Sequence, residues 1–447
     1  MTDYIVTNGR MLDGDDAGLR PADRRESDAN VVDVEIRDGV IDRIVPAGEG
    51  DPSAFADDRH YDADGRLLTP PLIEPHVHLD ATGTAGDPSW NDSGTLAEGI
   101  EVWAEYKKDI TVDDILERAT KTVEWYASHG VTRIRTHADT TEPSLTTVEA
   151  LVELKSRVSD LVDLQVVAFP QDGILTDESN EDLLSEAIEM GVDLVGAIPH
   201  NEYTREDGVQ SVEIACDLAE RHDLPLDLHI DETDDPGSRF TEVLASESIK
   251  RGIGDRVTAS HTTAMHSYNN AYADKLISML AESGVSVVTN PPDNSVLQGA
   301  YDDYPRRRGH TRIDELRGAG VTVGLGHDSV LDPWYHYGVA DPLDAAFILA
   351  HYAHMAGRGD VEVLWEMLTE ANAEIFDAGG DDGSTYGLSE GNEGSLVVYD
   401  SPDGFNALRR QAPRTLVLRD GEPIAETEPR ATTVHRADGP VDVDYKR

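Results

Sequence analysis

Cysteine and phenylalanine are scarce in this chain of 447 residues, which has one cysteine and six phenylalanines. The single thiol, Cys216, excludes an internal disulfide and excludes a cysteine cluster that could bind a metal ion. Long apolar runs are also missing, since none approaches the roughly eighteen residues that a membrane-spanning helix needs. The chain begins Met1-Thr2-Asp3-Tyr4, without the basic and apolar regions of a signal peptide, so we expect a cytoplasmic protein.

Basic residues are also scarce. Lysine and arginine number 37 against 88 aspartates and glutamates, which gives a formal net charge of −51. A surface of this charge repels phosphate backbones and anionic lipids, so we expect no nucleic-acid partner and no membrane partner. Acidic residues are spread from Asp3 to Asp444, and few of the basic residues are lysine. This pattern favours a halophilic protein, whose self-repulsion is screened by concentrated salt, over a protein with an acidic disordered tail.

Short strands separated by turns occupy both ends of the sequence. Residues 32–36 and 414–418 are runs rich in branched side chains, and turn pairs such as Asp38-Gly39 follow them. The polar segment 13–30 is expected to be a solvated loop within this region. The domains that we predict are a small β-sandwich from residues 1–68 and 389–435, a barrel over 69–388 and a C-terminal tail over 436–447.

The middle of the chain alternates between short apolar runs and stretches with helical periodicity. The apolar runs are Leu67–Glu74, Val131–His137, Val162–Pro170, Leu194–His200, Leu226–Asp231, Val257–His261, Val285–Asn290 and Val321–Asp328. A strand followed by a helix, repeated eight times, predicts an α/β protein with a (β/α)₈ TIM-like barrel. An open doubly wound sheet would alternate too, but it usually has a glycine-rich phosphate turn after an early strand, and the sequence has none.

Histidines and carboxylates gather at the carboxyl ends of these runs, where barrel enzymes have their active sites. His76 and His78 are two residues apart on an expected strand, so both side chains point to the same face. His229, His261 and Asp328 follow the fifth, sixth and eighth runs. Imidazole nitrogens and a carboxylate oxygen at one barrel mouth predict a site for a divalent transition metal ion.

The predicted metal site also indicates a chemistry. A metal ion bound by neutral imidazoles and a carboxylate lowers the pKa of its water, which gives a hydroxide able to attack carbon. Asp328 can be a ligand and also accept a proton, and Glu232 is placed to pass protons to the substrate. For His261 the sequence leaves two roles open, a metal ligand or an imidazole beside the hydroxide. Because no lysine ends an expected barrel strand, we predict one metal ion rather than two.

Longer stretches of the sequence resemble the amidohydrolase superfamily and, more closely, the bacterial cytosine deaminases within it. The resemblance begins near Thr69 and runs through the carboxyl terminus. Its most specific stretches are PHVHLD at 75–80, GTLAEGIE at 94–101, AFPQDGIL at 168–175, GAIPH at 196–200, DET at 231–233, TASHTTAMHSYN at 258–269, LGHD at 325–328 and LDPWY at 331–335. The resemblance implies hydrolytic deamination of cytosine to uracil and ammonia, a reaction of pyrimidine salvage, by an enzyme that tends to form homo-oligomers.

The resemblance also implies individual roles. One Fe²⁺ or Zn²⁺ ion per subunit would be bound by His76, His78, His229 and Asp328. Within the active site, the catalytic residues would be Glu232, His261 and Asp328, and the residues around the pyrimidine would be Gln171, Phe169, Leu96 and Trp334. Of these, Gln171 would hydrogen-bond the pyrimidine edge, since an amide can both donate and accept.

Two positions depart from the family pattern. The bacterial enzymes have a second acid after the metal-binding aspartate, where this chain has Ser329, and Asp293 stands where the family pattern is more apolar. Ser329 is expected near the substrate, so a differently substituted ring becomes an alternative substrate. We consider isocytosine, isoguanine, creatinine and N-alkyl triazines, and from another class of function a barrel that has lost catalysis and acts as a scaffold.

Overall fold

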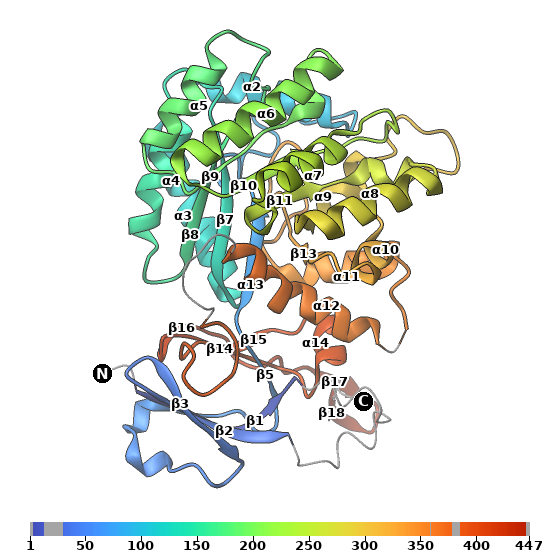
Figure 1. Ribbon diagram of the computed structural model, residues 1–447. Coiled ribbons are helices and arrows are strands. Elements are labelled where there is room, and N and C mark those ends of the chain that lie inside the picture. Colours follow the sequence, from blue (N-terminus) through green and yellow to red (C-terminus); the bar gives the residue numbers. More distant parts are fainter. Residues whose placement is uncertain (1–2, 13–29, 358, 378–384, 444–447) are drawn as a thin grey trace.

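The computed structural model describes residues 3–12, 30–357, 359–377 and 385–443. Its larger part is a barrel of parallel strands surrounded by helices, and its smaller part is a sheet below the barrel (Figure 1). The barrel strands are β6 (Leu72–Val77), β7 (Val131–Asp139), β8 (Asp163–Phe169), β9 (Leu194–Val195), β10 (Leu226–Ile230), β11 (Val257–His261), β12 (Ser286–Thr289) and β13 (Val323–Leu325). The predicted (β/α)₈ barrel is therefore confirmed.

The barrel closes where its first and last strands meet. Each strand pairs with its neighbour in chain order, from β6 through β13. An isolated parallel bridge between Val77 and Asp328 then links the two edges. The backbone N–H of Asp328 donates to the carbonyl of His76 at 2.9 Å, and the N–H of His78 donates to the carbonyl of Asp328 at 3.1 Å. Closure thus brings Asp328 directly beside the two histidines of β6.

Helices surround the barrel, and two of them, α2 (Leu96–Tyr106) and α9 (Pro291–Leu297), also contribute residues to the pocket described below. The others are α3 (Val112–Ser128), α4 (Thr146–Arg157), α5 (Asn180–Glu189), α6 (Arg205–His222), α7 (Phe240–Arg251), α8 (Asn270–Ser283), α10 (Ile313–Gly318), α11 (Pro342–Tyr352), α12 (Asp360–Leu368) and α13 (Glu370–Phe376). Helix α3 shows why these segments are helical. Thr111 caps its first turn by accepting from the N–H of Asp114, and Ile115, Ala119 and Val123 recur on its buried face.

Strands from both ends of the chain form the second sheet. They are β1 (Tyr4–Met11), β2 (Val31–Arg37), β3 (Val40–Pro46), β4 (His60–Asp62), β5 (Leu67–Thr69), β14 (Leu396–Tyr399), β15 (Arg414–Arg419) and β16 (Glu422–Glu426). Short helix α14 (Gly404–Arg410) connects two of these strands. The sheet confirms a small β-domain built from both ends of the chain, although its boundaries remain predictions. Most of the polar segment 13–30 lies outside the described residues.

The first predicted apolar run, Leu67–Glu74, is divided between the two sheets. Its start, β5, pairs with β1 and β14 in the smaller sheet, whereas the strand that begins at Leu72 belongs to the barrel. Pro70 and Pro71 separate the two parts. Proline has no N–H to donate to a ladder, so this pair marks the point where the chain leaves one sheet for the other.

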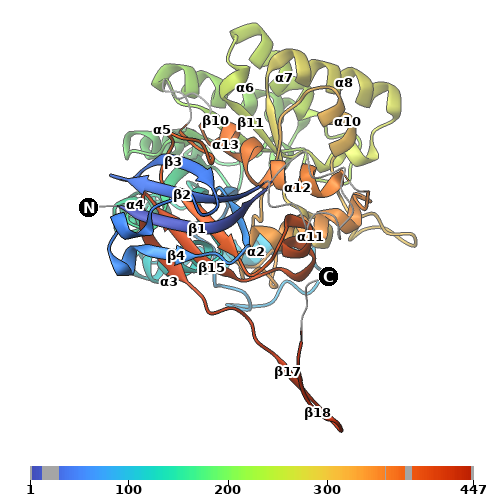
Figure 2. The ribbon, with the colours of Figure 1, turned by 90° about the horizontal axis from the view of Figure 1, so that it is seen from below.

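The last described strands, β17 (Thr433–Arg436) and β18 (Gly439–Asp442), form a hairpin of their own. Figure 2 shows this hairpin projecting from the rest of the molecule. The predicted tail over 436–447 therefore begins inside a hairpin.

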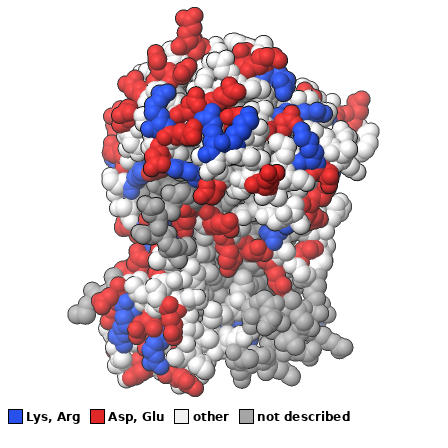
Figure 3. Space-filling view, viewed as in Figure 1, with Lys and Arg blue, Asp and Glu red and all other residues white. Residues whose placement is uncertain are grey.

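Acidic side chains are spread over the face of the molecule that Figure 3 shows, with fewer basic side chains between them. None of the helices in the described part of the chain combines the length and the apolar composition that crossing a membrane requires.

Candidate metal centre and active site

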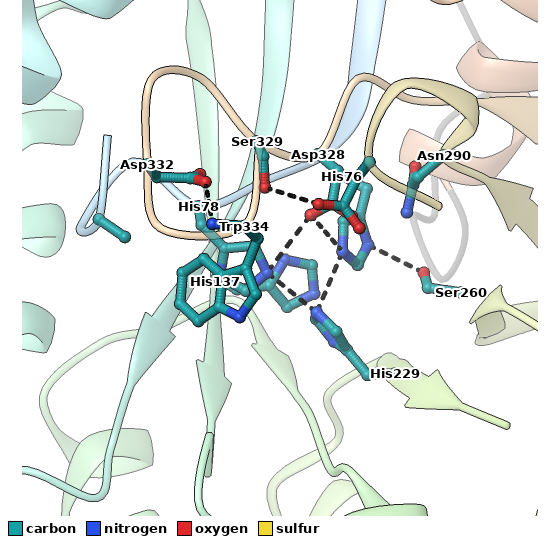
Figure 4. Close-up of polar contacts among 12 residues, drawn as sticks. His76, His78, His137, His229, Ser260, Asn290, Asp328, Ser329, Asp332 and Trp334 are labelled. Carbon is teal, nitrogen blue, oxygen red and sulfur yellow. Dashed lines mark hydrogen bonds and ion pairs between the residues drawn. The ribbon is translucent and has the colours of Figure 1, made fainter. Parts of the chain in front are cut away.

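Four of the predicted ligands converge inside the barrel (Figure 4). Nε2 of His229 lies 3.2 Å from Nε2 of His76 and 2.9 Å from Nε2 of His78. Oδ1 of Asp328 lies 3.6 Å from Nε2 of both His76 and His78. β6 and β10 are the first and fifth of eight strands, so their histidines approach one another across the barrel. The four side chains thus present three nitrogens and one oxygen to a common point.

The backbone at Asp328 and His261 turns these side chains inward. Both residues have φ near +73°, in the left-handed region that residues other than glycine rarely adopt. Such strained conformations persist where the surrounding structure fixes them, and they cluster at functional sites. At Asp328 the two hydrogen bonds to β6 supply that support.

The histidines of this cluster are held neutral. Burial lowers the pKa of His76, His78 and His229 well below the ordinary value, and neighbouring histidines add to the effect. Neutral imidazole is the form that binds a metal ion. Three neutral imidazoles and a carboxylate fit Zn²⁺ or Fe²⁺, which prefer nitrogen and oxygen ligands of this kind.

A further histidine, His137, borders the cluster from the end of β7. Its ring centroid lies 4.1 Å from that of His76, and its ligand atoms lie within 4.8 Å of those of His76 and His78. Asp227, a buried residue of β10, accepts a hydrogen bond from the guanidinium of Arg135 at 3.0 Å. Nε2 of His137 lies 3.9 Å from that carboxylate, so His137 rests between the predicted ligands and a buried ion pair.

His261 lies beside the four converging ligands. Its Nδ1 lies 3.1 Å from Nδ2 of Asn294, 3.6 Å from Oε1 of Glu232 and 3.8 Å from Oδ2 of Asp328. Its Nε2 has no hydrogen-bond partner among the described residues, and His261 forms with His76 and His229 a group of side chains close enough together to hold a metal ion. Burial lowers the pKa of His261 to about 3. His261 is thus a neutral ring whose Nε2 has no protein partner among the described residues.

Glu232 is held in place through its neighbour in the chain. The carboxylate of Asp231 accepts from Ser238 Oγ at 2.6 Å and from the N–H groups of Phe240 and Thr241 at 2.9 Å and 2.8 Å. These bonds anchor the loop between β10 and α7 that contains Glu232. Burial raises the pKa of Glu232 well above the ordinary value, with Asp293 adding to the effect, so its carboxyl group favours the protonated form.

A small pocket opens onto this cluster. The residues that line it are His78, Leu96, Gln171, His229, Glu232, His261, Asp293, Leu297, Asp328, Ser329 and Trp334. Four of the predicted substrate contacts are among them, and the fifth, Phe169, instead stacks on His229 with ring centroids 4.0 Å apart.

Glycine allows one wall of the pocket to close. A Cβ atom added to Gly99 in α2 would lie 2.4 Å from Cδ1 of Trp334. Only glycine therefore permits α2, whose first residue is Leu96, to pack this closely on the tryptophan.

Two pocket residues, Asp293 and Leu297, were not predicted as site residues. The only signal for Asp293 in the sequence is that it departs from the family pattern. Burial raises its pKa to about 8, and Asp332 contributes. Burial raises the pKa of Asp328 well above the ordinary value, and the carboxyl groups of Asp293 and Glu232 add to the effect; a divalent cation among these groups would offset their repulsion.

Comparison with known families gives a match over most of the chain. Residues 59–112 and 106–425 match the model of the Amidohydrolase family. A solved structure of 5-methylcytosine deaminase from Klebsiella pneumoniae, liganded with 5-fluorocytosine, is 42% identical in sequence. Its TM-score is 0.87, and the alignment covers 96% of this chain and 98% of that chain.

More distant relatives have other ring substrates in their names. The structure of N-isopropylammelide isopropylaminohydrolase from Burkholderia multivorans is 26% identical with a TM-score of 0.78, covering 95% of this chain and 99% of that one. Pterin deaminase from Rhizobium rhizogenes is 28% identical over 89% of this chain and 88% of its own length. The predicted resemblance to cytosine deaminases is confirmed, because the 42% identical structure is that of a 5-methylcytosine deaminase.

Proposed function

Because the chain belongs to the amidohydrolase family, we propose that this enzyme hydrolyses the exocyclic amino group of cytosine or of a 5-substituted cytosine. Cytosine and water would give uracil and ammonia. The observation that carries the proposal is the buried pocket in which Gln171, Glu232 and Asp328 line one small space. The 42% identity to a 5-methylcytosine deaminase supports the same substrate class.

The ring would be oriented by hydrogen bonds along its edge. The side-chain amide of Gln171 can donate to the C2 carbonyl and accept from the adjacent N–H of a pyrimidone. Glu232, whose carboxyl group favours the protonated form, can donate to the ring nitrogen next to the carbon under attack. Leu96 and Trp334 would provide the apolar walls.

We propose that His76, His78, His229 and Asp328 bind one Fe²⁺ or Zn²⁺ ion. When bound, such an ion lowers the pKa of a water molecule toward neutrality and so supplies the nucleophile at ordinary pH. Asp328 would accept the proton that this water gives up and pass it to the departing amino group. We propose that the unpartnered Nε2 of His261 carries the ring proton and would donate to the oxygen that adds to the ring carbon.

Ser329 affects which pyrimidines the pocket can accept as substrates. It lines the pocket next to Asp328, at the position where the family pattern has an acid. Serine is smaller than the family's acid and uncharged, so a substituent on the ring would meet less bulk and no charge at this position. We therefore expect 5-methylcytosine to be a substrate alongside cytosine.

Ammonia release from purified enzyme tests the proposal. The enzyme is supplied with Fe²⁺ or Zn²⁺ in concentrated KCl and given cytosine, 5-methylcytosine, isocytosine, isoguanine, creatinine and N-isopropylammelide in parallel. We expect turnover of the two cytosines and roughly one metal ion per subunit by elemental analysis. Turnover of another ring, without ammonia from either cytosine, would overturn the proposal.

A further inference from the structure

Asp293 is a buried acid in the pocket to which none of the roles above has been assigned. It lies in α9, the short helix that follows the seventh barrel strand, and only 1% of its surface is exposed. Its side chain lines the same pocket as Gln171 and Glu232. Burying a carboxyl group is costly unless it has partners, so the partners of Asp293 indicate what this wall can bind.

The hydrogen bonds of Asp293 determine the polarity of its wall. The hydroxyl of Ser329 donates to Oδ1 of Asp293 at 3.3 Å. Because the serine proton points at Asp293, the oxygen lone pairs of Ser329 remain available as acceptors. Oδ2 of Asp293 accepts from Asn294 at 3.4 Å, and the same amide donates to Glu232 at 3.1 Å. The lone pairs of Ser329 thus face the pocket as acceptors, and the carboxyl oxygen of Asp293 that has no proton can accept beside them.

Barrel topology puts this pair opposite Gln171. Gln171 follows β8, the third strand, and Asp293 follows β12, the seventh. Strands three and seven are four places apart in a closed ring of eight, so their carboxyl ends lie on opposite walls. A flat ring in the pocket is therefore flanked by an amide on one side and by the Asp293–Ser329 pair on the other.

The two walls fit opposite edges of an aminopyrimidine. In cytosine the N1–H and C2 carbonyl form one edge, and the C4–C5 edge with its amino group lies across the ring. If Gln171 binds the first edge, the amino group faces acceptor oxygens. Resting on the proposed function, we infer that Asp293 contacts the exocyclic amino group of the substrate and determines specificity for rings that have one. Asp293 thus brings a carboxyl group into the pocket from α9, whereas the family pattern has its carboxyl group at the position of Ser329.

Substitution of Asp293 tests this contact with a ligand that lacks the amino group. Pyrimidin-2-one has the same amide edge as cytosine but a hydrogen at C4. In Asp293→Leu, loss of a hydrogen bond to a carboxyl group is expected to lower kcat/KM for cytosine by about 10- to 100-fold. The inhibition constant of pyrimidin-2-one should stay unchanged. Asp293→Asn keeps the volume and an acceptor oxygen, so we expect a smaller loss for cytosine with the same unchanged inhibition.

The control lies on the same helix. Leu297→Ala removes an apolar wall of the pocket, so it should weaken cytosine and pyrimidin-2-one alike. Metal content and unfolding temperature are measured for each variant to verify folding. If both Asp293 variants weaken the two ligands equally, or weaken neither, the inference is wrong and the proposed function stands. If the wild-type enzyme releases no ammonia from cytosine or 5-methylcytosine, the proposed function fails first and the inference fails with it.

Discussion

The hydroxyl of Ser260 lies 3.0 Å from Nδ1 of His76 and 2.6 Å from the carboxylate of Asp227, to which it donates. Since the serine proton points at Asp227, the serine oxygen accepts from the ring of His76. His76 therefore holds its proton on Nδ1 and presents the lone pair of Nε2 to the other predicted ligands. A partner of this kind orients a metal-binding histidine and raises its basicity.

Replacing Ser260 tests this relationship. We expect Ser260→Ala to weaken Zn²⁺ binding by about 10- to 100-fold, because His76 loses the partner that fixes its tautomer. The measurement is competition for Zn²⁺ against a chelator of known affinity. Ser156→Ala is the matched control, since Ser156 is exposed on α4, a helix on the outside of the barrel (Figure 1). Equal affinity in the two variants would show that the hydrogen bond to His76 does not matter for binding.

Glu232 should be required for turnover and dispensable for metal binding. Glu232→Gln preserves the size of the side chain and its contact with Asn294, which lies 3.1 Å away, but it removes the transferable proton. We expect normal metal content and a loss of nearly all ammonia release from cytosine. Asp328→Asn, by contrast, should lose metal as well as activity. Near-normal turnover in Glu232→Gln would refute its role in proton transfer.

The barrel and the convergence of its histidines were predictable because their signals are local. Each barrel strand is a short apolar run, and the spacing of His76 and His78 requires only the two-residue period of a strand. The pocket walls depend instead on packing between distant segments. Phe169 was expected to line the pocket but stacks behind His229. Asp293 was noticed as a departure from the family pattern, yet its hydrogen bond to Ser329 arises only when the barrel closes.

The smaller sheet shows in the same way that local sequence patterns do not predict pairing between distant segments. The run Leu67–Glu74 looks like one strand in the sequence, because both of its halves are apolar and nothing local assigns them to different sheets. Only the pairing of β5 with β14, more than 300 residues later in the chain, reveals that the run is divided. Contacts of such long sequence separation have no signature in local periodicity.

Lys107 joins the helical wall of the pocket to the barrel. Its buried ammonium donates to Asp139 at 2.8 Å and to Asp172, the residue after Gln171, at 2.7 Å. In Lys107→Met the carboxylate of Asp139, which is 1% exposed, loses its charged partner. Breaking a buried pair in this way costs about 3 to 5 kcal/mol of unfolding free energy. Urea unfolding in concentrated KCl measures the change.

The neighbouring lysine provides the control for this experiment. Lys108 forms an ion pair with Glu105 in which both side chains are more than half exposed. Exposed pairs contribute at most about 1 kcal/mol, so Lys108→Met should unfold nearly as the wild type does. Similar unfolding curves for the two lysine variants would contradict a structural role for Lys107.

Acid should destabilise the protein partly through His310. This side chain stacks on Tyr352, and burial lowers its pKa to about 4, with a smaller effect of His266. In the unfolded chain a histidine has a pKa of about 6.5, so below that pH the unfolded state binds a proton that the folded state does not. Stability is therefore lost as the pH falls from about 6.5 to 4. In His310→Gln the slope should be smaller by up to about 1.4 kcal/mol per pH unit.

Unfolding temperatures at several pH values measure this slope. His351→Gln is the control, because His351 is exposed on α11. A control slope equal to that of the wild type, together with a shallower slope in His310→Gln, would support the prediction. If the three slopes coincide, burial of His310 does not affect stability in acid.

Salt should stabilise this protein strongly. With a net charge of −51, like-charged side chains repel one another over the whole surface, and this repulsion favours the expanded, unfolded chain. The Debye length falls from about 10 Å at 0.1 M salt to about 3 Å at 1 M, so concentrated KCl removes most of the repulsion between neighbouring carboxylates. Salt also weakens surface ion pairs, such as those of Arg251 with Asp217 and Glu220. Exposed pairs contribute little, so relief of repulsion dominates and the unfolding temperature should rise steadily with KCl.

A parallel series in sucrose separates charge screening from general exclusion of a cosolvent, because sucrose leaves the repulsion in place. Full stability at low salt, or an equal gain in sucrose, would contradict adaptation to salt.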